Sequence, residues 1–378
     1  MIRQNGLDKR FPQRWQQKAL GTFFILSCVS LISACSADRL QVKANMTPST
    51  SADTATSVAY KSAYSPERSQ YGVIEVDGIE LTTMRDHTLP LKVYAPDGDG
   101  PFPVIIFSHG TGASKDDYAE LGEFWAARGY VSVHPSHADS LSLREGRANF
   151  RRLRSVLEGV LEDANQWVER GEDVALVARQ LAEIERSSEQ LSGKLDGDRV
   201  GIAGHSFGAY GAQVAGGAKV SLPNETETFE LSPPENVKAV LLLSPQGTGQ
   251  QGLTNESWRN FQLPMMVMTG LRDQGAQGQD YRWKTEPFEL APATSNKYLV
   301  ILAQANHFSF GGRTQAEERR VGPLRQRRQA SAQRTMDYVK FASLGFWDTY
   351  LNNNAQAQDY LLNEMEEISG GEASVSFR

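Results

Sequence analysis

The chain has 378 residues, of which 22% are charged and 40% are hydrophobic, an ordinary globular mixture that excludes collagen-like, coiled-coil and wholly disordered proteins. Its net charge of −6 gives no basic surface for nucleic acid, so no nucleic-acid partner is expected. The two cysteines, Cys28 and Cys35, both lie near the N-terminus, which excludes a disulfide-stapled fold and a thiolate zinc site.

An export signal is predicted at the N-terminus. Residues 19–31 form an apolar run that is shorter than the roughly 20 residues needed to span a bilayer, and Arg10, Arg14 and Lys18 are among the basic residues that precede it. A basic region, a short apolar region and small residues before a break are typical of a secretory signal peptide. The break, Leu31-Ile32-Ser33-Ala34-Cys35, resembles a bacterial lipoprotein box, which implies a signal peptide over residues 1–34 and a lipid on Cys35.

Two alternatives stay open for this segment: cleavage by an ordinary signal peptidase, and a retained anchor. The lipoprotein resemblance implies a mature protein that is lipid-anchored in the cell envelope. Ser36, directly after the cysteine, resembles lipoproteins that are sorted to an outer membrane, where they face the periplasm or the exterior. Residues 35–70 are rich in Ser, Thr and Ala without an apolar period, so they are predicted to form a flexible tether.

The folded domain is predicted over residues 71–378. Its opening is an antiparallel pair of strands, near 73–76 and 91–94. The continuous apolar run 103–107 is expected of a strand that is buried on both faces of a parallel sheet.

The rest of the domain alternates between helices and strands. Helices are predicted over 116–128, 148–169, 172–190 and 336–351, and strands over 130–133, 200–203, 237–243, 265–269 and 298–303. This alternation predicts one α/β domain with a mostly parallel sheet and helices on both faces. Residues 138–170 are longer than a plain connection needs, and they form either a cap over the site or a helix packed on the sheet edge.

Ser206 is the candidate nucleophile. It stands in Gly204-His205-Ser206-Phe207-Gly208, between a predicted strand and a small-residue helix. A serine on such a sharp turn presents its hydroxyl above the sheet, and flanking glycines are needed because the turn passes close to its neighbours. The following helix points its N-terminal dipole and free N–H groups at a developing oxyanion.

A serine hydroxyl is a poor nucleophile without a base, so a histidine is required. The chain has six: His87, His109, His134, His137, His205 and His307. In the hydrolase order the base follows the nucleophile and a further strand, which leaves His307 by elimination.

Asp273 is the candidate acid that orients His307. It follows the predicted strand 265–269, where the third member of such a triad is expected. Asp280 and Glu286 are the reserve candidates, and a turn-capping role is the structural alternative for Asp273.

Two backbone N–H groups are expected to form an oxyanion hole. One belongs to Phe207, directly after the nucleophile. The other is assigned to Thr111, with Gly110 as the alternative, in the loop after the strand 103–107. His109 is expected to fix this loop through a hydrogen bond.

The segment His134-Pro135-Ser136-His137-Ala138-Asp139 brings two histidines and a carboxylate close together in sequence. No metal site is expected, because a proline intervenes, no helix holds the pair on one face and no cysteine ligand is present. The end of a strand is a suitable place for His137 or Asp139 to line a pocket.

Together these residues resemble the α/β-hydrolase superfamily, most closely the bacterial branch of platelet-activating-factor acetylhydrolase-like proteins and predicted dienelactone hydrolases. The resemblance covers roughly residues 73–360 and rests on five segments: 107–110, 204–208, 269–273, 306–310 and 346–351. It implies the α/β-hydrolase fold and hydrolysis of a small-molecule carboxylic ester through an acyl-serine, with no cofactor. It indicates no oligomeric state.

The sequence also departs from both groups. In animal acetylhydrolases the acid follows the strand after the nucleophile helix, but residues 243–248 contain no carboxylate here, so a phospholipid substrate is not implied. Dienelactone hydrolases use cysteine, whereas Ser206 favours general esters. Two other functions stay open: an amidase or peptidase with the same triad, and an inactive tethered binding protein.

Overall fold

The structure, a computed structural model, describes residues 64–143, 158–223, 228–293, 296–311 and 323–378. The predicted signal peptide, Cys35 and the tether up to residue 63 lie outside the described residues. Within the described ranges no helix is both long enough and apolar enough to cross a membrane.

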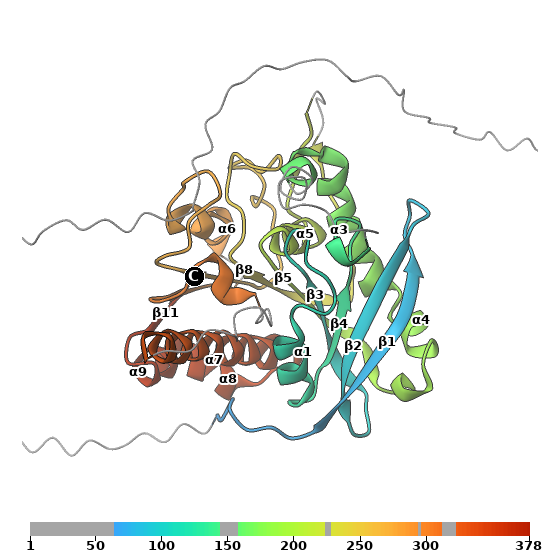
Figure 1. Cartoon of the computed structure of the whole chain (residues 1–378), viewed down its shortest axis with the longest axis horizontal. Coiled ribbons are helices and arrows are strands. Elements are labelled where there is room, and N and C mark those ends of the chain that lie inside the picture. Colours follow the sequence, from blue (N-terminus) through green and yellow to red (C-terminus); the bar gives the residue numbers. More distant parts are fainter. Residues whose placement is uncertain (1–63, 144–157, 224–227, 294–295, 312–322) are drawn as a thin grey trace, which may run out of the picture. The chain divides into compact units, whose positions relative to one another are not determined.

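Nine strands of the described residues form one sheet in the order β1-β2-β4-β3-β5-β8-β9-β10-β11 (Figure 1). They are β1 Gly72–Thr82, β2 Thr88–Asp97, β3 Phe102–Ser108, β4 Val131–Pro135, β5 Leu195–His205, β8 Val237–Leu243, β9 Met265–Gly270, β10 Lys297–Leu302 and β11 Ala373–Phe377. The six strands from β4 to β10 are parallel, while β1, β2 and β11 pair antiparallel at the two edges. This arrangement confirms the predicted α/β-hydrolase fold.

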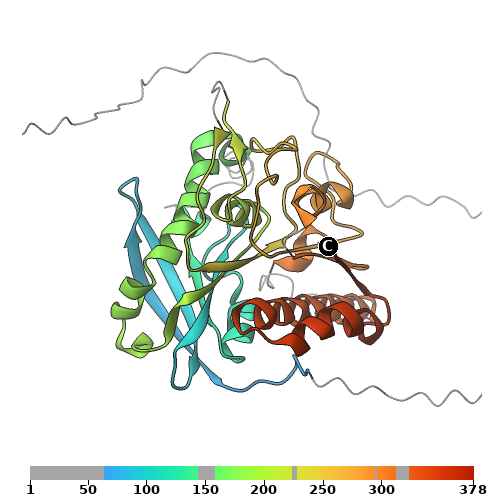
Figure 2. The same cartoon turned by 180° about the vertical axis from the view of Figure 1, so that it is seen from behind.

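Helices cover both faces of this sheet (Figures 1 and 2). On one face lie α3 (Ala164–Arg179) and α5 (Phe207–Ala215), and on the other lie α1 (Ala119–Ala126) and α7 (Pro323–Leu351). The other helices of the described residues are α4 Leu181–Arg186, α6 Glu286–Leu290, α8 Ala355–Asp359 and α9 Met365–Ile368, with a π-helical turn over Tyr360–Glu364. Short 3₁₀ turns cover Leu141–Leu143, Glu189–Leu191, Tyr281–Thr285 (η3) and His307–Phe310 (η5), and β6 (Val220–Ser221) pairs with β7 (Thr228–Phe229).

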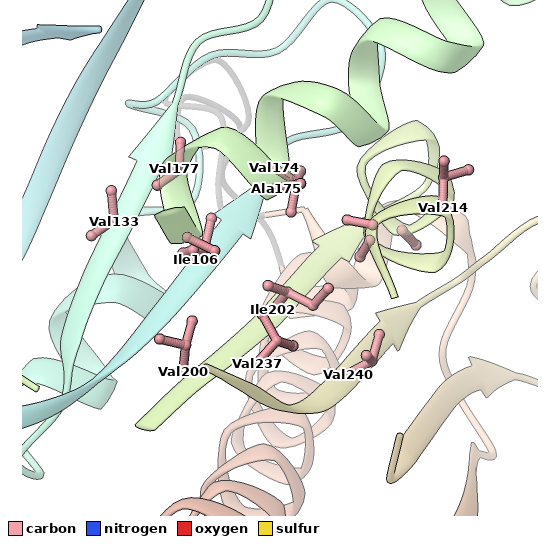
Figure 3. Close-up of a cluster of buried hydrophobic side chains, with 14 of the residues drawn as sticks. Ile106, Val133, Val174, Ala175, Val177, Val200, Ile202, Val214, Val237 and Val240 are labelled. Carbon is pink, nitrogen blue, oxygen red and sulfur yellow. The ribbon is translucent and has the colours of Figure 1, made fainter. Parts of the chain in front are cut away.

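The core has two apolar clusters, one on each face of the sheet. Alternate residues of β3 enter different clusters: Ile106 belongs to one, and Phe107 to the other. Figure 3 shows the first cluster, in which Ile106, Ile202 and Val240 meet Val174 of α3 and Val214 of α5. A strand that is apolar at every position is therefore buried on both faces, as the run 103–107 predicts.

The region around residue 171 differs from the expectation. The sequence predicts a break between two helices there, but α3 continues through Gly171. A Cβ at this glycine would lie 2.4 Å from Cγ1 of Val214, so Gly171 allows α3 and α5 to pack closely instead of ending the helix. Of the predicted cap, residues 144–157 lie outside the described residues, and residues 164–170 belong to α3.

Candidate active site

Ser206 lies on a sharp turn between β5 and α5. Its backbone has φ 56° and ψ −121°, a conformation that is rare for a residue with a side chain. A Cβ on Gly204 would lie 2.2 Å from the carbonyl carbon of Gly208, and a Cβ on Gly208 would lie 1.9 Å from the Ser108 oxygen. Both glycines are thus required by close backbone approach.

The structure brings His307 to Ser206 from a loop about a hundred residues further along the chain. His307 begins η5, in the loop that follows β10, and its Nε2 lies 3.0 Å from Oγ of Ser206. The preceding Asn306 fixes this turn, because its side chain accepts a 2.9 Å hydrogen bond from the Phe308 amide while its own amide donates to Ser309 at 3.0 Å. The imidazole is therefore held on a short, capped turn.

Asp273 lies beside the same imidazole, in the turn after β9. Its Oδ1 is 3.4 Å from His307 Nδ1 and 3.7 Å from the Lys284 ammonium, while its Oδ2 accepts a 3.0 Å hydrogen bond from Thr269. Burial raises the pKa of Asp273, but the neighbouring imidazole and the positive charge of Lys284 outweigh it, so the net pKa is lowered. The carboxyl group is ionised near neutral pH.

The reserve acids have other partners. Asp280 caps η3 by accepting a 2.8 Å hydrogen bond from the Arg282 amide. Glu286 accepts a 2.6 Å hydrogen bond from the Thr248 amide. Of the three candidate acids, the structure places Asp273 next to His307.

Ser244 is a residue that the sequence analysis missed. It follows β8, and its Oγ lies 2.7 Å from His307 Nδ1, closer than the Asp273 oxygen. The loop 243–248 contains no carboxylate, but it brings a hydroxyl to the same nitrogen. The available signal was its position, because the carboxyl ends of neighbouring parallel strands meet at one edge of the sheet.

The candidate oxyanion donors differ in whether their amides already have a hydrogen-bond partner. Phe207 is the first residue of α5, where a backbone N–H has no partner within the helix. In the loop 108–112, the Gly110 amide donates to the Tyr118 hydroxyl at 3.2 Å, and the Gly112 amide donates to Asp139 at 2.8 Å. Among the described residues the Thr111 amide has no hydrogen-bond partner, which favours Thr111 over Gly110.

A buried ion pair flanks Thr111. Arg170 of α3 donates one hydrogen bond to Asp139 and another, at 2.9 Å, to the carbonyl oxygen of His109. Asp139 in turn accepts from Gly112, so the pair holds the residues on both sides of Thr111. Arg170 and Asp139 are 2% and 1% exposed, which makes this a fully desolvated contact.

The histidines of this region are paired with protein groups. His109 Nδ1 donates to its neighbour's carbonyl at 2.7 Å, and its Nε2 accepts from the His137 amide at 3.0 Å. His137 contacts Asp173 at 2.8 Å and Ser108 at 2.9 Å. His134 faces Ser132 at 2.8 Å. His109 thus has the loop-fixing contact expected of it, while His137 and Asp139 lie in this buried network.

His205 connects the two sides of Ser206. Its Nε2 lies 2.9 Å from the carbonyl oxygen of His307, and its Nδ1 lies 2.8 Å from the Tyr118 hydroxyl. Because a carbonyl only accepts, Nε2 carries the hydrogen and Nδ1 accepts from Tyr118. Burial lowers the pKa of His205 to about 3, so the ring is neutral.

A surface cavity of about 800 Å³ lies elsewhere, at the amino ends of β3 and β5. Arg128 and Asp348 are among its lining residues. Both are already paired within the protein, Arg128 with the carbonyl oxygen of Pro66 and Asp348 with the Tyr130 hydroxyl. The cavity is remote from Ser206, and the nucleophile geometry makes the carboxyl rim of the sheet the candidate active site.

Comparison with known proteins finds one matching family model and two similar curated proteins. A family model described as Chlorophyllase matches residues 59–223, which contain Ser206 and the loop 108–112 but neither Asp273 nor His307. Platelet-activating factor acetylhydrolase of Cavia porcellus is 30% identical over 32% of this chain and 33% of its own length. The Bos taurus protein of that name is 26% identical over 28% and 30%.

The chain spans about a third of the length of these curated relatives. The Chlorophyllase model covers less than half of this chain. The matches and the parallel sheet together support membership of the α/β-hydrolase superfamily.

Proposed function

We propose that this protein is a serine hydrolase that cleaves carboxylic esters through an acyl intermediate on Ser206. The observation that carries the proposal is the 3.0 Å contact between Ser206 Oγ and His307 Nε2, at a strained turn between β5 and α5. A nucleophile and a base within hydrogen-bond reach, with the base oriented by a third group, are the mark of nucleophilic catalysis.

In the proposed mechanism, Ser206 Oγ attacks the ester carbonyl while its proton moves to His307 Nε2. The oxyanion that forms accepts hydrogen bonds from the amides of Phe207 and Thr111, each contributing on the order of 3 kcal/mol to the transition state. The imidazolium then returns its proton to the leaving alcohol. Water, deprotonated by His307, releases the acid and restores Ser206.

Asp273 is the proposed electrostatic partner of this imidazolium. Its carboxylate is buried and ionised, and it lies 3.4 Å from Nδ1 of His307. A negative charge there stabilises the positive charge that develops on the ring during attack.

We favour ester cleavage over amide cleavage because both similar curated proteins are named platelet-activating factor acetylhydrolase. The same residues could cleave an amide, since a triad does not distinguish the two bonds. An assay with p-nitrophenyl acetate and with p-nitroacetanilide, which carry the same acyl and aryl groups, decides this point. We expect turnover of the ester and at least a hundredfold lower kcat/KM for the anilide.

The mechanism is tested by Ser206→Ala and His307→Ala in the same ester assay. Each should abolish hydrolysis while thermal unfolding and circular dichroism stay those of the unmodified protein. Ser257→Ala is the control, because Ser257 is a buried serine whose hydroxyl accepts from the Thr254 amide outside the site. Retained turnover in both site variants, or no labelling of Ser206 by an organophosphonate, would refute the proposal.

We also propose that the mature protein is anchored in the cell envelope, at the outer membrane, by a lipid on Cys35. The basis is the lipoprotein-like box, which lies outside the described residues. In a bacterial host, Cys35→Ser should abolish incorporation of labelled palmitate. Equal palmitate labelling of the Cys35→Ser variant and the unmodified protein would contradict the proposed lipid anchor.

A further inference from the structure

The Nδ1 atom of His307 faces two oxygen atoms at unequal distances. Ser244 Oγ lies 2.7 Å away, and Asp273 Oδ1 lies 3.4 Å away. A charge-assisted N–H···O hydrogen bond is ordinarily about 2.7–2.9 Å long. The direct hydrogen-bond partner of Nδ1 is therefore the hydroxyl of Ser244, not the carboxylate.

The backbone holds Ser244 at this place. Its amide donates to the Met268 carbonyl at 2.8 Å, and the carbonyl of the preceding Leu243 accepts from Ser206 at 3.0 Å. Ser244 is fully buried and has φ +50°, in the left-handed region that residues with side chains rarely adopt. The turn that fixes the nucleophile thus also fixes this serine, in a conformation with an energetic cost.

The direction of each hydrogen bond follows from the chemistry of the neighbours. Nε2 of His307 must be unprotonated to accept the proton of Ser206, so the ring hydrogen is on Nδ1 and Ser244 Oγ accepts it. The hydroxyl hydrogen of Ser244 then needs an acceptor of its own. Asp273 Oδ1 is buried beside the same nitrogen and has no hydrogen bond of ordinary geometry within the described residues, to Ser244 or to any other group, so it is the acceptor that remains available.

The charge of Asp273 is kept in place by other groups. Thr269 donates to its second oxygen at 3.0 Å, and the buried ammonium of Lys284 lies 3.7 Å from its first. Lys284 also donates to the carbonyl of Pro245, the residue after Ser244, at 3.4 Å. Ser244 is itself among the groups that lower the pKa of Asp273. The carboxylate is thus an ionised, fixed acceptor.

We propose that Ser244 is a positioning residue that links His307 to Asp273: it accepts the Nδ1–H hydrogen bond and donates its own hydroxyl hydrogen to Oδ1 of the carboxylate. This inference rests on the proposed esterase function and extends it from three residues to four. No proton leaves Ser244 during the reaction. Its role is to hold the ring in the Nδ1–H tautomer. Through its hydrogen bond to Asp273 it also lets the carboxylate stabilise the positive charge of the imidazolium.

The first test is Ser244→Ala, assayed with p-nitrophenyl acetate. We expect kcat to fall about 10- to 100-fold with KM within about twofold, as for loss of one hydrogen bond to a group that becomes charged in the transition state. Ser132→Ala is the matched control, because Ser132 is also fully buried and also contacts a histidine nitrogen, that of His134, at 2.8 Å. The control should keep the kcat of the unmodified protein.

Ser244→Gly separates the hydroxyl from the backbone. Glycine adopts a positive φ without cost, so it relieves the strain and removes the hydroxyl at once. Our proposal predicts that Ser244→Gly is impaired as much as Ser244→Ala. A glycine variant with normal kcat beside an impaired alanine variant would overturn it, since the loss would then come from backbone strain.

Moving the acid gives the sharpest test. Asp273→Asn should lower kcat about a thousandfold or more, and Asp273→Asn combined with Ser244→Asp should regain at least tenfold, because the new carboxylate faces Nδ1 directly. Aspartate tolerates a left-handed backbone better than most residues. A merely structural role for Ser244 predicts no such rescue.

The outcomes also separate this inference from the proposed function. If Ser206→Ala is inactive while Ser244→Ala keeps a normal kcat and the double variant shows no rescue, Ser244 has no positioning role and the esterase proposal stands. If Ser206→Ala is active, both fail.

Discussion

The two sides of Ser206 are held in different ways. On the acid–base side, His307, Asp273 and Ser244 come from loops after three successive strands, and the His307 side chain is 31% exposed. On the oxyanion side, residues 108–112 lie over a buried ion pair between Arg170 and Asp139. One side presents a side chain to the substrate, and the other fixes a stretch of backbone.

This difference matches what each side must do in the proposed reaction. A base has to meet both the nucleophile and the leaving group, so partial exposure of its ring is required. A backbone N–H is removed only by substitution with proline, and its position depends on the loop that carries it. Arg170 and Asp139 hold that loop at His109 and Gly112, on both sides of Thr111.

The largest loss of folding stability is expected on the oxyanion side, from Asp139→Ala. This substitution leaves the buried Arg170 guanidinium unpaired and frees the Gly112 amide. Breaking a buried ion pair in this way typically costs about 3–5 kcal/mol, and we expect kcat to fall with it. Urea unfolding and the ester assay measure the two losses.

Glu256→Ala is the control for Asp139→Ala. It breaks the ion pair of Glu256 with Arg259, whose side chains are 66% and 74% exposed, and such a pair contributes at most about 1 kcal/mol. Equal destabilisation by the two variants would contradict the contrast between the sides. By comparison, Ser244→Ala should reduce kcat with little loss of stability.

The sequence sufficed for the parts of this site that follow from chain order and local pattern. The turn at Ser206 follows from glycine spacing, and His307 was identified by elimination among six histidines. The strand at 237–243 was predicted with the observed bounds, because a fully apolar run between polar segments leaves little freedom.

The missed contacts depend on packing between distant segments. Arg170 was part of a stretch with two open interpretations, and nothing local indicates that its guanidinium lies beneath the loop 108–112. Ser244 meets His307 through the register of β8 on β9 and a positive φ, neither of which a residue pattern encodes. Side-chain partners across the sheet therefore need coordinates.

A second expected effect is loss of stability in acid, mainly through the buried histidines of the oxyanion side. Burial lowers the pKa of His134 to about 3, and it lowers the pKa of His109 and His137 well below the ordinary value. An unfolded histidine titrates near 6.5. Between pH 6.5 and 3 the unfolded chain thus binds more protons, so stability falls as pH decreases, by up to about 1.4 kcal/mol per pH unit for each histidine.

Asp173 opposes this trend, because burial raises the pKa of Asp173 to about 6, and that contribution is lost as pH rises through 6. Burial also lowers the pKa of His205 and raises that of Glu169, so four histidines outweigh two carboxyls and the net slope stays positive with pH. Urea unfolding at pH 7, 6 and 5 measures it, and His134→Gln should reduce the slope by up to about 1.4 kcal/mol per pH unit. Equal stability at pH 7 and pH 5 would show that these histidines are not buried as neutral rings.

The smallest loss of kcat is expected where the acid–base side and the oxyanion side meet. Tyr118→Phe removes the hydroxyl that accepts from the Gly110 amide and donates to His205, leaving both without that partner while the ring keeps its contact with Phe107. Each unsatisfied buried group costs about 1–3 kcal/mol. Because His205 holds the His307 carbonyl, we expect kcat to fall by about 3- to 10-fold.

Tyr350→Phe is the control for this link. It removes a 2.9 Å hydrogen bond to the Tyr298 hydroxyl, at a half-buried tyrosine that lies on α7 and outside the site. The control should lose about 1 kcal/mol of stability with kcat unchanged. If Tyr118→Phe behaves in the same way, the acid–base and oxyanion sides are positioned independently. If only Tyr118→Phe slows turnover, the hydrogen-bond chain through His205 couples them.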